Sequence, residues 1–244
     1  MSIRATSRVD RLLSSMGYGS RKDVARMAKA GCVTLDGTQL LDVTKRIAVS
    51  ADLPSRMAIA GQPLDPIAGM VILLNKPLGM TCSHNEIGPL VYDILPDRWK
   101  RRDPVISTIG RLDKQTSGLL LLTDDGDLLH RIISPRHHVK KTYRARLDRP
   151  LKGDEGELFA SGDMMLEGET KPLAPAELEV VSDTEALLHV TEGRSRQVRR
   201  MFAATGNHVT ALHRERLGGL SLPDGLKPGQ WKLLGEDEIA LISP

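Results

Sequence analysis

Two short, wholly apolar runs constrain the fold of this chain more than any other feature. Met70–Leu74 reads Met-Val-Ile-Leu-Leu, and Leu119–Leu122 is an unbroken run of leucine. A helix that crosses a bilayer needs about 20 apolar residues, so neither run is long enough. Short apolar runs that end in turn signals are typical of buried strands. The segments 75–79 and 123–126, rich in Asn, Pro, Asp and Gly, are such signals. We therefore expect a soluble protein built around a sheet.

The remainder of the sequence after residue 70 predicts further strands and helices. The expected strands lie near 142–148, 176–181 and 185–191, and the expected helices near 126–133, 151–161 and 195–205. Strands that follow one another along the chain and are joined by short turns favour an antiparallel or mixed sheet. We predict an α+β fold in which a mixed, mostly antiparallel sheet is flanked by helices.

The first 50 residues carry the signals of a small separate module. Ser20 is a good N-cap and Asp23 adds capping-box character, so a helix is expected over 21–30. Gly31 ends that helix, and the next segment reads as a strand that enters an Asp36-Gly37 hairpin turn. An earlier helix is expected from the apolar stripe of Val9, Leu12, Leu13 and Met16.

Pro and Gly residues gather between 52 and 69 and indicate a boundary. A chain of 244 residues is long enough for a small module followed by a medium-sized domain. We predict three parts: a domain over 6–52, a linker over 53–69 and a second domain over 70–244.

The distribution of charge points to an anionic polymer as partner. The net charge is only +3, but residues 1–50, 131–149 and 192–216 each hold a clear excess of Lys and Arg. Separate basic stretches suit a polyanion better than one small anion, although ordinary solvated faces explain any single stretch equally well. Aromatic residues make up only 3% of the chain, which disfavours a base-stacking platform.

Several classes of protein lack support. Two cysteines, Cys32 and Cys82, cannot form a disulfide framework and suggest a reducing compartment. Residues 1–6 have no apolar core for a signal peptide, so we expect a cytoplasmic protein without membrane contact. The sequence contains no metal-binding motif, and Asp124-Asp-Gly-Asp127 reads as a turn. Glycine-rich nucleotide motifs and the Gly-x-Ser-x-Gly elbow are also missing. We expect no metal and no cofactor.

One segment carries a pattern suited to chemistry. Gly110-Arg-Leu-Asp-Lys-Gln-Thr-Ser-Gly118 is a polar loop directly before the leucine run. Arg111 and Asp113 are two residues apart and point the same way in an extended segment. A carboxylate beside guanidinium groups stays ionised and can act as a nucleophile. From the pattern alone, a surface Arg–Asp pair is at least as good an explanation.

Several further segments extend this pattern into a resemblance that covers nearly the whole chain. Gly110–Thr123 resembles the active-site motif of the RsuA/RluA-type pseudouridine synthases, Asn75-Lys-Pro77 resembles their first motif, and Lys141-Thr-Tyr143 resembles the motif with their active-site tyrosine. Glu192–Met201 resembles their third motif, which carries a basic residue. The resemblance implies the fold of that family and an isomerase that needs neither metal nor cofactor.

The family's roles pass to matching positions in this sequence. Asp113 is implied as the nucleophile, attacking either the ribose or the base, and Arg199 as its basic partner. Tyr143 is implied to pack against the target base near C5. Arg111 is implied to fill the gap that the flipped uridine leaves, since an inserted guanidinium can stack on neighbouring bases.

Residues 8–50 resemble an S4 RNA-binding domain, the module that precedes the catalytic domain in the RsuA branch. Phosphate contacts are expected from Arg8, Arg21, Lys22, Arg26 and Lys29, with further RNA contacts from Arg194 and Arg196.

Ser134–His138 and Met201–Arg216 most resemble the members of this branch that modify small-subunit (16S) rRNA. The implied target is uridine 516, with a small-subunit assembly intermediate as partner and a monomer as the acting form. Arg196 departs from this group, which often has His there, and matches the large-subunit (23S) relatives. Two alternatives therefore stay open: a large-subunit enzyme, and a non-catalytic ribosome-binding or assembly factor. A third, a metal-dependent hydrolase using Asp113 with Asp124 or Asp125, is weaker.

Overall fold

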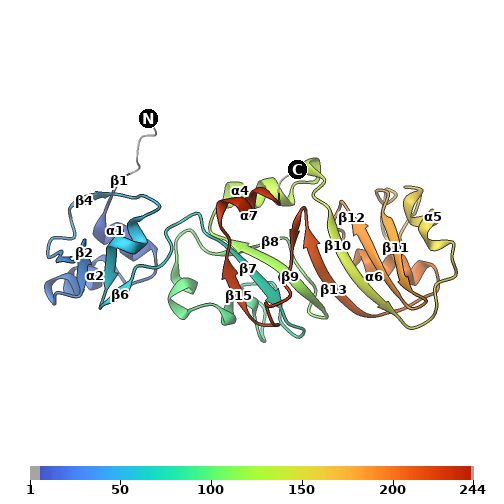
Figure 1. Ribbon diagram of the computed structural model, residues 1–244, viewed down its shortest axis with the longest axis horizontal. Helices are drawn as coiled ribbons and strands as arrows, with labels where there is room; N and C mark the ends of the chain where they lie inside the picture. Colours follow the sequence, from blue (N-terminus) through green and yellow to red (C-terminus); the bar gives the residue numbers. More distant parts are fainter. Residues whose placement is uncertain (1–5, 243–244) are drawn as a thin grey trace. The chain divides into compact units, whose positions relative to one another are not determined.

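The computed structural model describes residues 6–242, apart from the side chain of Pro135. The chain forms two compact units (Figure 1). The first contains the residues up to Met70 together with Leu95–Ser107 and Thr123–Asp125. The second contains Val71–Ile94, Thr108–Leu122 and the chain from Gly126 onward. Within the described residues, no helix is both long enough and apolar enough to cross a membrane.

The first unit packs short helices against two small sheets. β1 pairs with β4, and a second sheet has the strand order β3-β2-β5-β6. Its elements are β1 (Thr6–Arg8), α1 (Val9–Ser15), α2 (Arg21–Lys29), β2 (Val33–Leu35), β3 (Thr38–Gln39), β4 (Arg46–Ala48), α3 (Leu53–Arg56), β5 (Met57–Ile59), β6 (Gln62–Pro63) and the 3₁₀ helix η2 (Asp97–Arg101). The segment predicted as a linker thus contains α3, β5 and β6. Strand β5 pairs with β2, where Met57 lies opposite Leu35, and this segment is therefore part of the sheet.

Local sequence signals explain how this unit begins. Ser20 accepts a hydrogen bond from the backbone N–H of Asp23, and the Asp23 carboxylate accepts one from the Ser20 N–H, so the capping box forms. Asp36 and Gly37 both have positive φ, as the hairpin turn between β2 and β3 requires. The buried side chains of Val9, Leu13 and Val24 pack in one core with β2 and β5.

The second unit is built on one large mixed sheet. Its strand order is β11-β12-β10-β13-β9-β7-β15, with β14 beside β13 and β8 beside β9. The strands are β7 (Val71–Lys76), β8 (Ser107–Ile109), β9 (Thr116–Thr123), β10 (Lys141–Leu147), β11 (Glu177–Ser182), β12 (Glu185–Val190), β13 (Val209–Leu217), β14 (Leu220–Ser221) and β15 (Trp231–Leu233). Strand β9 runs parallel to β13, and β10 runs antiparallel to both β12 and β13. The predicted α+β class with a mixed sheet is confirmed.

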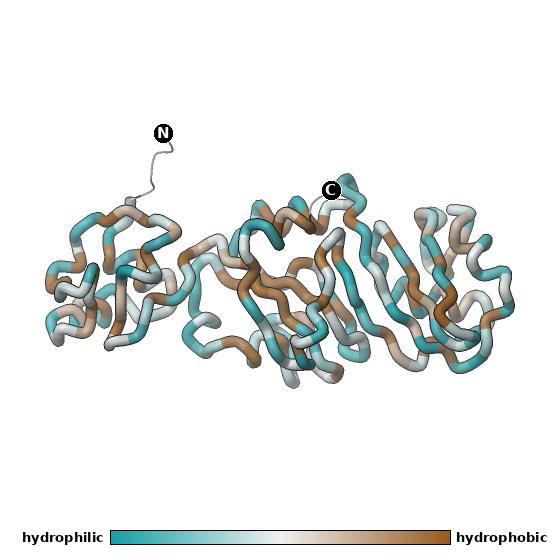
Figure 2. Tube along the Cα trace, in the orientation of Figure 1, coloured by the Kyte–Doolittle hydropathy of each residue, from teal (hydrophilic) through white to brown (hydrophobic). Residues whose placement is uncertain are grey.

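Helices cover this sheet over two apolar clusters. They are α4 (Gly126–Ile133), α5 (Glu155–Ala160), α6 (Gln197–Ala204) and α7 (Glu236–Ala240), with 3₁₀ turns η1 (Val91–Ile94) and η3 (Pro135–His137). Phe159 of α5 and Phe202 of α6 meet edge to face over β10 and β12. α4 packs on β7 and β9, which Figure 2 shows as largely brown, apolar segments. The two apolar runs are thereby buried, as their composition predicts.

Candidate active site

A pocket of about 410 Å³ opens on the second unit. This volume falls within the usual range for a small-molecule site, about 300–1,000 Å³. Its lining comes from the loop before β9, from β10, β12 and β13, and from the segment that leads into α6: Arg111, Leu112, Asp113, Thr116, Tyr143, Val190, Glu192, Gly193, Arg194, Ser195, Arg196, Gln197, Val198 and Leu212. Residues that are far apart in the sequence, Asp113, Tyr143 and Arg196 among them, therefore face one cavity.

The Asp113 loop is held from beneath by a buried ammonium group. Lys76, at the end of β7, has no exposed surface. Its Nζ donates to the carbonyl oxygens of Pro77, Asp113 and Thr116, at 3.1, 3.2 and 2.9 Å. Burial lowers the pKa of Lys76, and the negative charge of Asp113 partly opposes this shift. The backbone of the loop is therefore fixed, while the Asp113 carboxylate is left exposed at the pocket.

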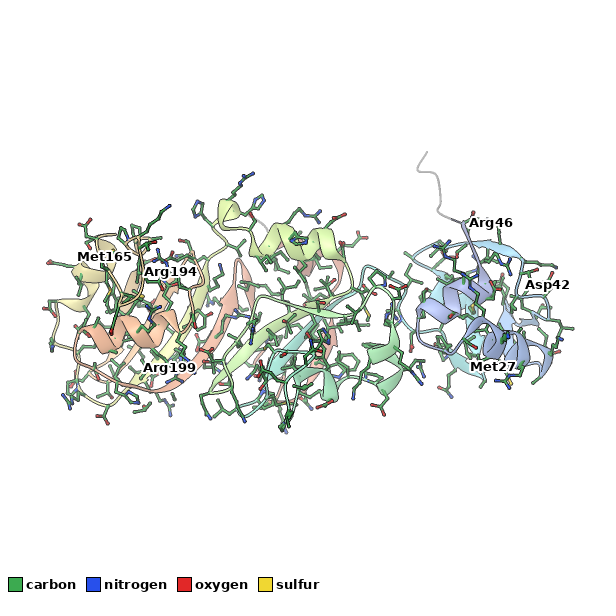
Figure 3. All side chains as sticks on the ribbon, turned by 180° about the vertical axis from the view of Figure 1, so that it is seen from behind. Met27, Asp42, Arg46, Met165, Arg194 and Arg199 are labelled. Atoms are coloured by element: carbon green, nitrogen blue, oxygen red, sulfur yellow. The ribbon has the colours of Figure 1, made fainter. Side chains whose placement is uncertain are left out.

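Arg199 also holds this loop through its backbone. The side chain lies on α6 (Figure 3), and its Nη2 donates to the carbonyl of Gln115 at 2.8 Å, while Nη1 donates to that of Val209 at 2.6 Å. Within residues 6–242, no ion pair within 4.0 Å joins Arg199 to Asp113. Burial lowers the pKa of the guanidinium, and the charge of Asp113 opposes this. The charge of Asp113 therefore acts on the Arg199 guanidinium at a distance, since no hydrogen bond or ion pair joins the two side chains in the described residues.

Tyr143 stands in the middle of the sheet. β10 pairs it with Leu188 on β12 and with Arg214 on β13. The residue is half-buried and lines the pocket together with Asp113. On the next strand, Nη1 of Arg214 lies 3.5 Å from the phenol oxygen. The backbone of Tyr143 is therefore paired on both sides, and its phenol is approached by Arg214 of β13.

Arg111 lies at the pocket with its side chain 69% exposed. Its Nη2 is 3.6 Å from a carboxylate oxygen of Glu86, which is also exposed. Such an exposed pair contributes about 1 kcal/mol or less. Arg111 is therefore held loosely and can be released at little cost.

The two arginines ahead of α6 differ in their freedom. Arg194 (Figure 3) forms ion pairs with Glu192 and Glu169, each at 3.1 Å, and also donates to the carbonyls of Lys171 and Pro172. Most of its donors are thus used inside the protein, although it lines the pocket. Arg196 is exposed and has a positive φ of 50°.

The basic residues predicted to bind phosphate lie in the first unit, and all five are exposed. Arg21, Lys22, Arg26 and Lys29 belong to α2. Arg26 pairs with Asp23. Arg8 is held by the buried carboxylate of Asp10 at 2.7 Å.

The metal-dependent hydrolase finds little support in the geometry of the described residues. The described residues contain no cluster of three or more His, Cys, Asp or Glu side chains that could hold a metal ion. Asp124 is buried, where it pairs with Arg102 at 3.0 Å and accepts from the N–H of Gly69 at 2.8 Å. Both interactions make Asp124 a structural residue.

Sequence reasoning did not single out Lys76, Glu86 or Arg214. Lys76 stands inside the Asn75-Lys-Pro77 motif, so a signal for it existed. Arg214 lies within a basic run that was interpreted as a surface for a polyanion and as part of the family resemblance, with no role assigned to the residue itself. Nothing in the sequence around Glu86 indicates that it reaches Arg111.

Comparison with known proteins matches nearly the whole chain. The family model described as RNA pseudouridylate synthase matches residues 70–204. The ribosomal small subunit pseudouridine synthase A of Escherichia coli strain K12 is 41% identical over 239 residues, covering 96% of this chain and 99% of that protein. The protein of the same name from Vibrio cholerae is 40% identical over 235 residues, with the same coverage.

A solved structure described as a pseudouridylate synthase has a similar fold. It superposes with a TM-score of 0.67 at 33% identity and covers 96% of this chain and 99% of its own. The likeness thus extends from the sequence motifs to the fold that carries them. With a family match over more than half of its length and relatives at about 40% identity from end to end, this chain belongs to the RNA pseudouridylate synthase family.

Proposed function

We propose that this chain is an isomerase that converts one uridine of small-subunit ribosomal RNA, uridine 516 of 16S rRNA, into pseudouridine. The observation that carries the proposal is the pocket that gathers Asp113, Tyr143 and Arg111 in a member of this family. The full-length likeness to proteins named ribosomal small subunit pseudouridine synthase A supports the choice of RNA.

The reaction breaks the bond between C1′ of the ribose and N1 of uracil, and joins C1′ to C5 of the same base. Asp113 is the nucleophile, attacking either the ribose or the base. Its exposed carboxylate on a loop fixed by Lys76 suits this role, because the nucleophile must be accessible while its backbone stays still. Arg199 holds the same loop at Gln115 and is the basic partner of Asp113.

Tyr143 packs against the base and lies near C5, where a proton must leave. Because the target atoms are hidden in a stacked helix, the nucleotide has to be flipped into the pocket, at a cost of a few kcal/mol. Arg111 leaves Glu86 and fills the gap in the RNA, where its planar guanidinium stacks on the neighbouring bases.

The remaining basic residues bind the RNA outside the pocket. The region 6–52 acts as an S4 domain, with the exposed cations of α2 on phosphates, and Arg196 adds a contact at the pocket. Phosphate contacts supply affinity and position but carry no base identity. The protein acts in the cytoplasm as a monomer on a partly assembled small subunit.

The proposal is tested by mapping pseudouridine in ribosomal RNA from cells with and without this protein. Carbodiimide treatment followed by primer extension is expected to give a stop at position 516 that disappears in the deletion strain and returns with the wild-type gene. An unchanged pattern across both ribosomal RNAs would refute the enzymatic assignment. Loss of a site in 23S rRNA instead would favour the large-subunit alternative, which the arginine at position 196 supports.

A further inference from the structure

Behind Tyr143 lies a buried guanidinium group that the proposed mechanism does not use. Arg214 of β13 is only 3% exposed. Its Nε donates to the carbonyl of Leu119 at 2.7 Å, and its Nη1 lies 3.5 Å from the phenol oxygen of Tyr143. The guanidinium carbon is 6.0 Å from the centre of the tyrosine ring. Its Nη2 is buried and has no hydrogen-bond partner among the described residues.

Arg214 also lacks a carboxylate partner within 4.0 Å in the described part of the chain. The next residue, Glu215, pairs instead with Arg144. The contrast with Arg102 is clear, because that equally buried arginine has Asp124 at 3.0 Å. Burying an ion without a counter-ion costs several kcal/mol, so one hydrogen bond to Leu119 does not account for the burial of Arg214.

The position of the Arg214 guanidinium suggests a role in the pocket. Tyr143 faces the pocket with Asp113, and Arg214 approaches the same phenol from the adjacent strand. When Arg214 donates to the phenol oxygen, the O–H of Tyr143 is available to donate to another acceptor. Hydrogen bonds of this kind are often long in a free enzyme and shorten when substrate binds.

We propose that Arg214 is a positioning residue of the pseudouridine synthase site: it fixes the Tyr143 phenol and places an uncompensated positive charge behind the base pocket. This charge favours negative charge that develops on the base held against Tyr143. The inference rests on the proposed function and adds a residue to it.

The test uses the full-length protein and a tritium-release assay on RNA that contains 5-tritiated uridine, under single-turnover conditions at saturating enzyme. Arg214→Met is expected to slow release about 100-fold, the lower end of what one preorganised hydrogen-bond donor contributes to a rate. RNA affinity is expected to change less than about threefold. Removal of the unpaired buried charge offsets the loss of the donor to the Leu119 carbonyl, so the melting temperature is expected to stay within about 2 °C of the wild type.

If Arg214 had only a structural role, Arg214→Met would lower the melting temperature and leave the rate per folded molecule unchanged. This outcome would overturn the proposal. Arg216→Met is the matched control, since it removes the same charge from an exposed position on the same strand. The control is expected to keep the wild-type rate.

If Arg214→Met does not fold, Arg214→Lys tests whether the residue acts through the Tyr143 phenol. It keeps the charge but not the planar geometry, and is expected to lose about tenfold in rate when Tyr143 is present. In a Tyr143→Phe background the same substitution is expected to have less than a twofold effect, because the phenol oxygen is gone. Equal losses in both backgrounds would refute action through the phenol. Wild-type protein run in parallel tests the proposed function separately, because failure of the wild type to release tritium would refute that function itself.

Discussion

Three buried cations in the described part of the chain, Lys76, Arg102 and Arg214, are accommodated in different ways. Lys76 is surrounded by three carbonyl oxygens, and Arg102 meets the carboxylate of Asp124. Arg214 donates to the carbonyl of Leu119 and lies 3.5 Å from the phenol oxygen of Tyr143. Since a buried charge needs partners, the first two arrangements are those of structural groups, and the third is that of a group retained for another reason.

Lys76→Met tests the structural role of this ammonium group. The substitution leaves the carbonyls of Asp113 and Thr116 without their donor, and a buried unsatisfied group costs about 1–3 kcal/mol. The free energy of unfolding in urea is expected to fall by about 2–4 kcal/mol, and the turnover rate is expected to fall with it as the loop loosens. Lys114→Met, at an exposed position of the same loop, is the control and should unfold like the wild type. Equal stability of the Lys76→Met protein would contradict this account.

Glu86→Gln is expected to improve RNA binding. The carboxylate holds Arg111 at 3.6 Å and repels phosphates that approach the pocket. Because the pair is exposed and worth about 1 kcal/mol or less, the expected gain in affinity is at most about fivefold, and it should shrink in high salt. Filter binding at two salt concentrations measures it, with Glu157→Gln as the control on α5. Weaker binding by Glu86→Gln would mean that this carboxylate contacts the RNA favourably.

Among single residues, the sequence motifs identified several that line the pocket, but not Arg199, which does not line it, and not the contacts that the side chains make. Asp113 and Tyr143 both lie at the pocket where a joint role needs them. Arg199, expected beside the carboxylate, donates instead to the backbone of Gln115 and Val209. A long side chain can choose among acceptors within its reach, and that choice depends on the tertiary structure, which a motif does not specify.

At the level of elements, locally encoded features could be predicted, whereas the short strands β8, β14 and β15 and the long strand β13 could not. The capping box at Ser20 and the Asp36-Gly37 turn depend on neighbouring residues alone, and both form. Helix α4 has the predicted bounds. Strand β13 was missed, because His213-Arg-Glu-Arg216 reads as a charged surface segment. Arg214 occupies a buried position between Leu212 and Leu217, and a charged residue there hides the apolar–polar alternation by which strands are recognised in a sequence.

Gly118→Ala tests the contact between β9 and β13. Gly118 has a φ of 105°, and a Cβ added there would lie 2.3 Å from the carbonyl oxygen of Arg214. That atom belongs to the backbone of a paired strand, and moving it would disturb the pairing of β13 with β9. We expect the substitution to lower the free energy of unfolding by more than about 2 kcal/mol. Gly126→Ala, where the added Cβ meets nothing within 4 Å, is the control and should leave stability nearly unchanged. A Gly118→Ala protein as stable as the control would show that this strand contact is looser than described.

At the scale of the whole molecule, the composition of the first unit was beyond the reach of sequence patterns. Leu95–Ser107 belongs to it although the chain has by then passed through β7. Arg98 of this segment pairs with Asp65 at 2.6 Å and lies 4.6 Å from the centre of the Tyr18 ring. These partners are separated by more than 30 residues. Periodicity and turn signals report on neighbours in sequence, so they cannot reveal such pairs.

The basic face of α2 predicts the salt dependence of RNA binding. Arg21, Lys22 and Lys29 are exposed, and replacing all three by alanine removes up to three phosphate contacts. Each contact adds about 0.7–0.9 to the slope of log affinity against log salt, so we expect the slope to flatten by about 2. Arg8 is left in place, because Asp10 is buried and depends on it. Arg101, Lys171 and Lys227, which are exposed, lie outside the three basic stretches and do not line the pocket, are replaced together as the charge-matched control. An unchanged slope for the α2 variant would place the RNA elsewhere.

The central claim is that the Asp113 carboxylate performs the chemistry, and tritium release from 5-tritiated uridine in small-subunit RNA tests it most directly. Asp113→Asn is expected to bind the RNA as tightly as the wild type and to release no tritium above background. Asp127→Asn, an exposed carboxyl in the first turn of α4, should release it at the normal rate. Normal turnover by Asp113→Asn would contradict the account, and would leave a basic protein whose contribution to the ribosome is made by binding alone.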